Sequence, residues 1–381
     1  MKKNVWAYIK LGNLEYFKVI MGQSPPSSSY HDCQGGLPFF QGKADFGALF
    51  PTPRKYCTAP NRIAEKSDVL ISVRAPVGPT NTADQKCCIG RGLAAIRCKD
   101  EVLPRFLLYA LRNIESAIAE SVRGQGGGFT AIKKDQLTAL EIPVPPLDEQ
   151  HRIVARIEEL TSRAEEVQRL SVAREKELDV LLQSAYGRMI ADVEWKHLSR
   201  VASIVRRGIS VKPEGKYEEM GTRSFGKGTF KKPVLTGKEI GNKRIYRIHE
   251  GDLVFNNVFA WEGAIAVAQE EDHGRAGSHR FITYAPHDGV STAEFLCHHF
   301  LSERGIEDIR AASPGSAGRN RTLGLKKLEQ IDVPVPDYHE QKRFAEMAKR
   351  RRTIRRECAT IERELKIFQS ALLAKAFRGE L

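Results

Sequence analysis

The sequence has no run near the roughly 18 uninterrupted apolar residues that a membrane-spanning helix needs. Its opening segment, "MKKNVWAYIKLGNLEYF", has two lysines but neither an apolar core nor a cleavage site, so no signal peptide is expected. The seven cysteines are odd in number, irregularly spaced and never arranged as C-x-x-C. These absences argue against a membrane protein, a disulfide framework and a zinc site, and they predict a cytoplasmic protein.

Motifs of nucleotide and methyl-transfer chemistry are also missing. No G-x-x-x-x-G-K-[ST] P-loop occurs. A DNA amino-methyltransferase needs a glycine-rich cofactor loop and an N-P-P-aromatic tetrapeptide, whereas "NNVF" at Asn256–Phe259 lacks both prolines and is better interpreted as a core strand.

Two further candidates for chemistry have simpler explanations. "PDYHEQK" at 336–342 holds the Pro-Asp and Glu-x-Lys elements of a metal-dependent nuclease, but they lie too close together and are better explained as an acidic helix start. His298 and His299 are adjacent, so they point apart on a helix, and no nearby Asp or Cys completes a metal site. We therefore expect no active site, no metal and no cofactor in this chain.

Basic residues outnumber acidic ones. The formal net charge is +13 and the isoelectric point is about 9.4. A polyanion, most simply nucleic acid, is the partner that this charge favours.

A prolyl junction occurs twice. "EIPVPPLDEQHR" at 141–152 and "IDVPVPDYHEQKR" at 331–343 align when the sequence is shifted by 191 residues. The same shift, without a gap, places "LLQSAYGRMI" at 181–190 on "LLAKAFRGEL" at 372–381. Looser echoes lie upstream: "KSDVLISV" resembles "EGDLVFNN", "RFLLYAL" resembles "EFLCHHF", and "GQGGGF" faces "GSAGRN". The chain is therefore a duplication of one unit rather than a solenoid, whose repeats are shorter.

Each copy has the same order of parts. A mixed region with short β-like runs and helical patches comes first, then a glycine-rich loop, a Pro-x-Pro strand expected at a sheet edge, and a long helix. These parts predict an α+β fold in which mixed α/β domains at 1–147 and 191–338 alternate with helices at 148–190 and 339–381.

The two long helices are expected to pair with each other. A narrow apolar stripe on a helix of about 60 Å needs a partner. The first helix carries a net charge of −2 and the second +6, which favours antiparallel pairing within the chain as a coiled coil with internal pseudo-two-fold symmetry. Packing of each helix on its own domain alone, or pairing between chains, remains open. The seam is predicted at Ile153, Ile157, Leu160, Val167, Leu178, Leu181, Ile354, Cys358, Ile361, Leu365, Phe368 and Leu372.

These features together resemble the specificity subunit of type I restriction–modification enzymes, over essentially the full length. The resemblance is carried by the twin "IPVPPLDEQ" and "VPVPDYHEQ" junctions with their helices, by "DVLISVRAPVGPTN" and "IGRGLAAI", and by the terminal "LLAKAFRGEL". It implies that the mixed domains are target recognition domains, each reading one half of a bipartite, asymmetric site in double-stranded DNA. It also implies that the helices set the gap between the halves and dock two methyltransferase subunits.

The resemblance places catalysis in other chains. It implies a non-catalytic chain without cofactors, S-adenosylmethionine in the methyltransferase subunits, and ATP and Mg in two restriction subunits where these are present. DNA contacts are expected from basic or amide residues in loops rich in glycine and proline. The candidates are Lys43, Arg54, Lys55, Arg62, Arg74, Asn81, Arg91, Arg206, Arg207, Lys212, Arg223, Lys231, Lys232, Arg319, Asn320 and Arg321.

Two other hypotheses remain. The chain could be a stand-alone nuclease or methyltransferase whose motifs are hidden, in which case the purified chain would itself transfer methyl groups or cut DNA. It could also be a helical scaffold that dimerises and binds nucleic acid without sequence preference, in which case its binding would be sensitive to salt but indifferent to sequence.

Overall fold

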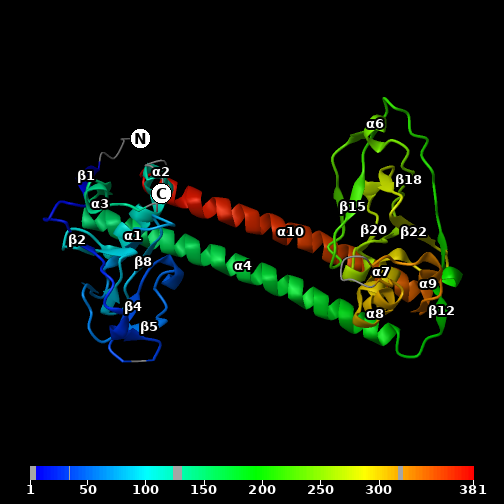
Figure 1. Ribbon diagram of the computed structural model, residues 1–381, viewed down its shortest axis with the longest axis horizontal. Helices are drawn as coiled ribbons and strands as arrows, with labels where there is room; N and C mark the ends of the chain where they lie inside the picture. The colour runs from blue at the N-terminus through cyan, green and yellow to red at the C-terminus, as the bar shows by residue number, and fades with distance from the viewer. Residues whose placement is uncertain (1–5, 34, 123–130, 316–320) are drawn as a thin grey trace. The chain divides into compact units, whose positions relative to one another are not determined.

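The computed structural model describes residues 6–33, 35–122, 131–315 and 321–381, and these form two units. The first unit comprises 6–170 and 360–381, and the second comprises 171–359. Each unit combines strands, short helices and a section of each long helix, so the predicted α+β class is confirmed (Figure 1).

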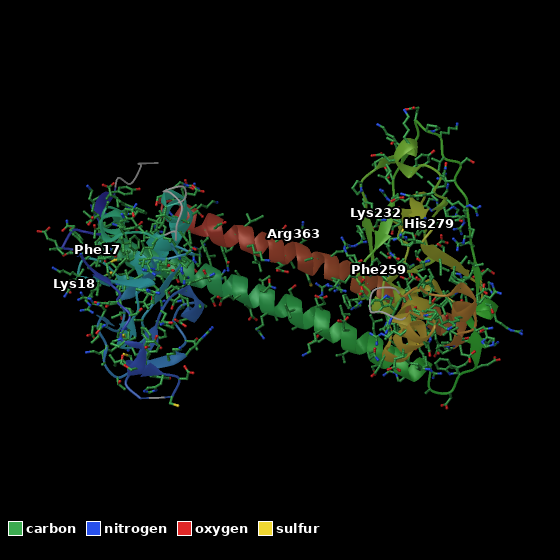
Figure 2. All side chains as sticks on the ribbon, viewed as in Figure 1. Phe17, Lys18, Lys232, Phe259, His279 and Arg363 are labelled. Atoms are coloured by element: carbon green, nitrogen blue, oxygen red, sulfur yellow. The ribbon has the colours of Figure 1, made fainter. Side chains whose placement is uncertain are left out.

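A four-stranded antiparallel sheet forms the centre of the first unit, with the order β2-β10-β7-β8. Its strands are β2 (Phe17–Met21), β7 (Val69–Ser72), β8 (Thr80–Thr82) and β10 (Leu93–Cys98). At the edge, Phe17 is buried and its neighbour Lys18 is exposed, as expected for alternating strand residues (Figure 2). Central β7 is buried on both faces: Val69 and Ile71 join one core cluster, and Leu70 joins another.

Helices cover one face of this sheet and a second sheet covers the other. The helices are α1 (Pro104–Asn113), α2 (Glu115–Ser121) and α3 (Lys134–Thr138), with the short turns η1 (Ser27–Ser29) and η2 (Lys43–Asp45). The second sheet has the order β3-β5-β4-β9-β6, in which β4 and β9 run parallel. Its strands are β3 (Tyr30–His31), β4 (Leu37–Phe40), β5 (Lys55–Cys57), β6 (Ile63–Ala64) and β9 (Cys87–Ile89).

The second unit repeats the four-stranded sheet, with the order β13-β22-β19-β20. Its strands are β13 (Ala202–Ile204), β19 (Leu253–Asn256), β20 (Ile265–Val267) and β22 (Phe281–Pro286). Leu253 and Phe255 of β19 join one cluster while Val254 joins another, as in β7. The helices are α5 (Leu198–Val201), α7 (Ala293–Leu301), α8 (Glu303–Ala311) and α9 (Leu325–Glu329), with η3 (Ala260–Glu262) and η4 (Glu270–Asp272).

The outer parts of the two units differ. In place of the five-stranded sheet, the second unit has three two-stranded sheets, β14-β17, β15-β16 and β18-β21. Their elements are β14 (Lys216–Tyr217), β15 (Met220–Thr222), β16 (Thr229–Lys231), β17 (Leu235–Thr236), α6 (Gly237–Ile240), β18 (Ile245–Arg247) and β21 (Ala276–Ser278). The duplication therefore retains the inner sheet and its helices, and diverges in the outer strands.

The Pro-x-Pro strands lie at edges, as predicted. Among the described strands, β11 (Glu141–Val144) pairs with β1 (Ala7–Lys10) alone, and β23 (Asp332–Pro334) pairs with β12 (Trp195–His197) alone. In a two-stranded sheet each strand has one unpaired side, so a residue without a backbone N–H is tolerated there.

A buried glutamine explains why the junction after each of these strands is repeated. Gln150 accepts a hydrogen bond from the Leu103 backbone N–H (2.9 Å) and donates to the Glu101 and Pro145 carbonyls at 2.9 and 2.8 Å. Gln341 accepts from Thr292 N–H (3.1 Å) and donates to the carbonyls of Val290 and Pro336, both at 2.9 Å. Both side chains are fully buried. In each unit the same clamp fastens the long helix to the loop before α1 or α7.

The long helices are α4 (Leu147–Met189) and α10 (Tyr338–Ala376). In the second unit they run antiparallel: Arg174 pairs with Glu357, Glu175 with Arg355 and Asp179 with Arg351. In the first unit, Arg152 near the start of α4 donates to the carbonyl of Leu381 (2.7 Å), and Ile153 and Leu372 share one core cluster. The opposite charges of the helices thus face each other. None of the described helices is long and apolar enough to cross a membrane.

Candidate nucleic-acid interface

Three of the predicted DNA contacts line one cavity in the first unit. Lys43 lies on η2, Arg74 follows β7, and Arg91 lies in the turn between β9 and β10. The cavity has a volume of about 330 Å³, and Tyr30 and Gln41 also line it. Residues far apart in the sequence meet here because the two sheets of the unit place their connecting loops together.

Hydrogen bonds and a β-bridge hold these loops in place. The Asp45 carboxylate accepts from Gln41 N–H at 2.8 Å and so fixes the entry to η2. Ser24 Oγ accepts from Arg91 N–H at 3.3 Å. Arg74 forms a β-bridge with Ala131, which ties the loop after β7 to the segment before α3. The backbone of the cavity is therefore fixed while the cationic ends of its side chains face solvent.

The charges of the cavity are unbalanced. Within the described part of the chain, no carboxylate lies within ion-pair distance of Lys43, Arg74 or Arg91, and all three side chains are exposed. Lys55 adds a fourth cation, with its Nζ 5.3 Å from the centre of the Tyr30 ring. Cations beside an aromatic ring and an amide form a surface suited to a polyanion with planar bases. Sequence reasoning missed Tyr30 and Gln41, whose signal is only their place beside Lys43.

Of the remaining predicted DNA contacts in the first unit, two are exposed and one is buried. Arg54 and Arg62 are exposed, and Arg54 donates to the Ala44 carbonyl at 2.9 Å. Asn81 is a correction: its side chain is fully buried in β8, and its Nδ2 donates to the Gly47 carbonyl at 2.8 Å. The prediction that Asn81 contacts a base was wrong, because this amide supports the core.

Arg207 of the second unit has an ion-pair partner within that unit. Its guanidinium makes two hydrogen bonds, of 2.7 and 3.1 Å, to the buried Asp252 carboxylate. The first unit has an equivalent pair, in which Arg97 binds the buried Asp68 at 2.9 and 2.8 Å. A buried carboxylate needs such a partner, so Arg207 stabilises Asp252, while 30% of its own side chain stays exposed. Its contact with DNA stays a prediction.

The other predicted DNA contacts that the structure describes in the second unit lie at its surface. Arg206 lies over the Tyr246 ring at 4.9 Å, and Lys212 is exposed. Arg223, Lys231 and Lys232 lie on the β15–β16 hairpin, where Lys232 pairs weakly with Glu219 at 3.7 Å.

Arg321 lies beside the turn that follows β19. Its guanidinium is 5.3 Å from the centre of the Trp261 ring. The neighbouring Leu323 N–H donates to the Asn257 carbonyl at 2.8 Å. Only Asn256 of "NNVF" belongs to β19 and residues 257–259 form a turn, so the interpretation of this segment as a core strand was wrong. Asn257 Oδ1 is buried without a hydrogen-bond partner among the described residues. Arg319 and Asn320 lie outside the described residues, as does most of the "GQGGGF" and "GSAGRN" segments.

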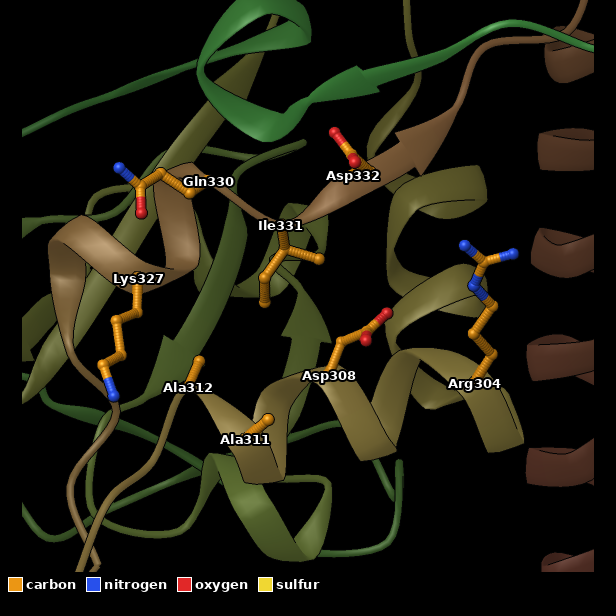
Figure 3. A pocket seen from close by; sticks show the side chains of 8 residues that line it. All are labelled: Arg304, Asp308, Ala311, Ala312, Lys327, Gln330, Ile331 and Asp332. Atoms are coloured by element: carbon orange, nitrogen blue, oxygen red, sulfur yellow. The ribbon is translucent and has the colours of Figure 1, made fainter.

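A second cavity, of about 380 Å³, lies between α8, α9 and β23 (Figure 3). Arg304 and Lys327 line it together with Asp308 and Asp332, so its charges are balanced. Arg304 also lies 3.8 Å over the Trp195 ring, and this contact holds its guanidinium. The cavity does not present the excess positive charge found in the first unit.

The helix seam follows the prediction only in part. Ile153, Ile157, Ile354 and Leu372 are buried. Leu160, Leu178, Cys358, Ile361 and Leu365 are half-buried. Val167, Leu181 and Phe368 were wrongly assigned to the seam, since they are 45%, 55% and 37% exposed.

The error in α4 has a geometric cause. Buried Ser171 occupies the seam where a heptad pattern would place an apolar residue, and Leu182 and Tyr186 are buried in place of Leu181. An α-helix turns by slightly less than a strict seven-residue repeat requires, so over several heptads the buried stripe drifts away from the positions that a fixed heptad predicts.

His298 and His299 are packing residues, as the sequence indicated. Tyr186 Oη lies 2.7 Å from His299 Nδ1, and the His298 ring lies between Tyr186 and Phe344, with centroids 4.8 and 5.0 Å away. Burial lowers the pKa of His298 to about 4 and that of His299 to about 3, and Arg351 and Arg304 respectively add to these shifts. Both rings are therefore neutral near pH 7.

The sequence was compared with protein families and with known proteins. Residues 6–173 match the type I restriction modification DNA specificity domain. The MjaX type I restriction enzyme specificity subunit of Methanocaldococcus jannaschii is 44% identical over 182 residues, which cover 46% of this chain and 42% of that protein. The chain thus aligns with less than half the length of this relative.

Two solved structures are also similar. The HsdS subunit from Thermoanaerobacter tengcongensis is 49% identical over 43% of this chain and 39% of its own, with a TM-score of 0.39. The S subunit of a type I restriction-modification system from M. genitalium is 15% identical, covers 99% of this chain and 97% of its own, and has a TM-score of 0.54, which shows a shared fold. Over residues 6–173, the chain is therefore similar to type I restriction modification DNA specificity domains.

Proposed function

We propose that this chain is the DNA sequence-specificity subunit of a type I restriction–modification complex, and that each unit reads one half of a bipartite, asymmetric site. The observation that carries this proposal is the pattern of divergence. The inner sheets of the two units have one strand order, whereas their outer strands, which bear many of the exposed basic residues, differ. Two units that share an inner sheet but differ in their outer surfaces are suited to bind two half-sites of different sequence.

The first unit supplies the clearest DNA-binding surface. Three cations, Lys43, Arg74 and Arg91, line its cavity. Lys55 lies over the Tyr30 ring that also lines the cavity, and none of the four has an ion-pair partner among the described residues. Phosphate contacts from such cations position a reader on DNA, while arginine and amide groups select bases. The exposed Gln41 amide and the arginines could thus contact base edges.

The long helices supply the spacing. A helix of 43 residues is about 65 Å long, which exceeds the ~34–36 Å between half-sites one helical turn apart. The exposed faces of α4 and α10 would dock two methyltransferase subunits that carry S-adenosylmethionine. Two restriction subunits that use ATP and Mg would join when the complex cleaves DNA. In this proposal the chain itself performs no chemistry.

The proposal is tested by sequencing methylated adenines in a host that carries the complex. We expect one motif of two short blocks separated by unspecified bases of fixed number. A scaffold without sequence preference, the alternative function, would give no motif when the chain is supplied to its methyltransferase partners. Methyl transfer by the purified chain alone would support an enzyme instead.

A further inference from the structure

The β15–β16 hairpin of the second unit presents an aromatic side chain to solvent. Its tip, residues 223–228, reads "RSFGKG". Phe225 is 73% exposed, the largest fraction among the large hydrophobic side chains of the described residues. Its neighbour Phe230, in contrast, is half-buried beneath Arg223.

The backbone of Phe225 is strained and held in place. Its φ of +61° lies in the left-handed region, which costs a residue with a side chain about 1–2 kcal/mol. Phe225 N–H donates to the Glu262 carbonyl at 2.8 Å, and Gly226 N–H donates to the Gly263 carbonyl at 2.9 Å. Ser224 Oγ donates to the Glu262 carboxylate at 3.0 Å. A fixed tip that displays an aromatic ring at a conformational cost indicates a functional role.

The charge of the hairpin is all of one sign. Residues 220–232 contain Arg223, Lys227, Lys231 and Lys232 and no acidic residue. Lys227 Nζ lies 5.7 Å from the centre of the Phe225 ring. No carboxylate of the described residues lies within ion-pair distance of Arg223, Lys227 or Lys231.

We propose that Phe225 inserts between neighbouring base pairs of the DNA half-site bound by the second unit, and thereby reads how easily that base step unstacks. The inference rests on the proposed function. Apolar wedges that insert at a base step are an established way for proteins to kink DNA, and flexible steps are the least costly to open. The surrounding cations are placed to bind the phosphates on either side of the step.

The same ring could instead be a contact for a protein partner. Phe225 borders a cavity of about 390 Å³ whose lining includes Asp179, Glu262, Arg351 and Arg355. Because that lining carries both acidic and basic side chains, it favours neither DNA nor a protein partner. The uniformly positive hairpin favours the polyanion, so DNA is the occupant we infer.

The test compares Phe225→Ala and Phe225→Gly with wild type in the complex purified through a tag on this chain. Phe259→Ala serves as the matched control, because Phe259 is an exposed aromatic residue of the same unit outside the hairpin (Figure 2). The probe is a duplex carrying the methylated motif, with 2-aminopurine substituted at successive positions of the second half-site. Affinity and 2-aminopurine fluorescence are measured for each variant.

Wild type should raise the fluorescence at one step, and both Phe225 variants should abolish that rise. They should also bind roughly 5- to 100-fold more weakly, the range for loss of one stacked aromatic contact. Phe225→Gly should keep the melting temperature at or above that of wild type, since glycine tolerates a positive φ. Phe259→Ala should behave as wild type.

Three results would overturn the inference. Unchanged affinity and fluorescence in Phe225→Gly would remove the ring from DNA recognition. Normal DNA binding with loss of a subunit from the purified complex would make Phe225 a protein contact. A fluorescence rise that survives in both variants would place the wedge elsewhere. Absence of any motif-specific binding by wild type would instead contradict the proposed function itself.

Discussion

Arginines of this chain have different roles, and the role of each depends on whether a buried carboxylate lies beside it. Arg97 and Arg207 each bind a buried aspartate, whereas Arg74 and Arg91 face solvent without a described carboxylate partner. Sequence alone did not separate these groups, because a loop arginine looks the same whether or not a buried acid lies beside it. The same limit explains Asn81, whose amide is bonded within the core.

We predict that Arg91→Ala relaxes only the half-site read by the first unit, and that Arg321→Ala relaxes only the other. Loss of one base contact costs about 1–3 kcal/mol of discrimination. Methylated-adenine sequencing of cells with each variant measures this directly. Arg163→Ala, which removes an exposed arginine from α4, is the control and should leave the motif intact. Equal relaxation of both halves by either variant would contradict the assignment of one unit to each half.

The buried histidines predict a pH dependence of stability. His298 and His299 have folded pKa values of about 4 and 3, below the ordinary value of 6.5. The unfolded chain therefore binds more protons as pH falls, so the stability contributed by the neutral rings is complete above pH 6.5 and declines from there toward pH 3 to 4. Melting curves between pH 7.5 and 4.5 should show this decline.

His298→Phe should flatten that decline without loss of stability at pH 7. The phenyl ring retains the packing against Tyr186 and Phe344, and the His298 Nε2 that it removes has no hydrogen-bond partner in the described structure. Exposed His279 offers a control, since His279→Phe should leave the slope unchanged. A slope identical to wild type in His298→Phe would show that other groups cause the acid sensitivity.

At the scale of helices and strands, the sequence predicted the elements that are defined by a local pattern of residues. The duplicated junction, the two long helices and the edge position of the Pro-x-Pro strands all follow from the sequence. The outer strands were not predicted, because most contain only two or three residues and are defined by their pairing partners. The phase of the α4 seam was also missed, at Val167 before Ser171 and at Leu181 after it, because the buried stripe drifts from a strict heptad.

The glutamine clamps should stabilise each junction between helix and domain. Gln150→Ala leaves Leu103 N–H and two carbonyls without their buried partner, which should cost about 1–3 kcal/mol of unfolding free energy. Gln150→Glu keeps an acceptor for Leu103 N–H but places a buried carboxylate oxygen against the Glu101 and Pro145 carbonyl oxygens, so its loss of stability should be at least as large. Chemical denaturation measures both. Since Gln341 makes the same contacts, Gln341→Ala should match Gln150→Ala, and two unaffected midpoints would contradict the clamp.

Helix length should set the gap between half-sites. Because α4 and α10 run antiparallel, a seven-residue deletion from α4, such as 164–170, should be combined with the deletion of 360–366 from α10. We expect the paired deletion to shorten the unspecified gap and leave both sequence blocks unchanged. Sequencing of methylated adenines provides the readout, and a gap that stays constant would exclude the helices from spacing.

At the scale of the whole molecule, the duplication is the feature that links sequence, fold and proposed function. The likeness of "KSDVLISV" and "EGDLVFNN" predicted two corresponding strands, which are β7 and β19, whereas the shared strand order of the inner sheets is known only from the structure. The bases that each unit reads were not foreseeable, since they depend on outer strands that have diverged.

The most direct test of the account replaces one of the two proposed DNA-recognition domains. The mixed domain of the second unit, residues 191–338, would be replaced by the corresponding domain of a specificity subunit with a known, different target, and the methylated motif would be sequenced. The account predicts that one block of the motif changes while the other block and the gap remain. A motif in which both blocks change, or neither does, from a folded and methylating complex would contradict the claim that each unit reads its own half of the site.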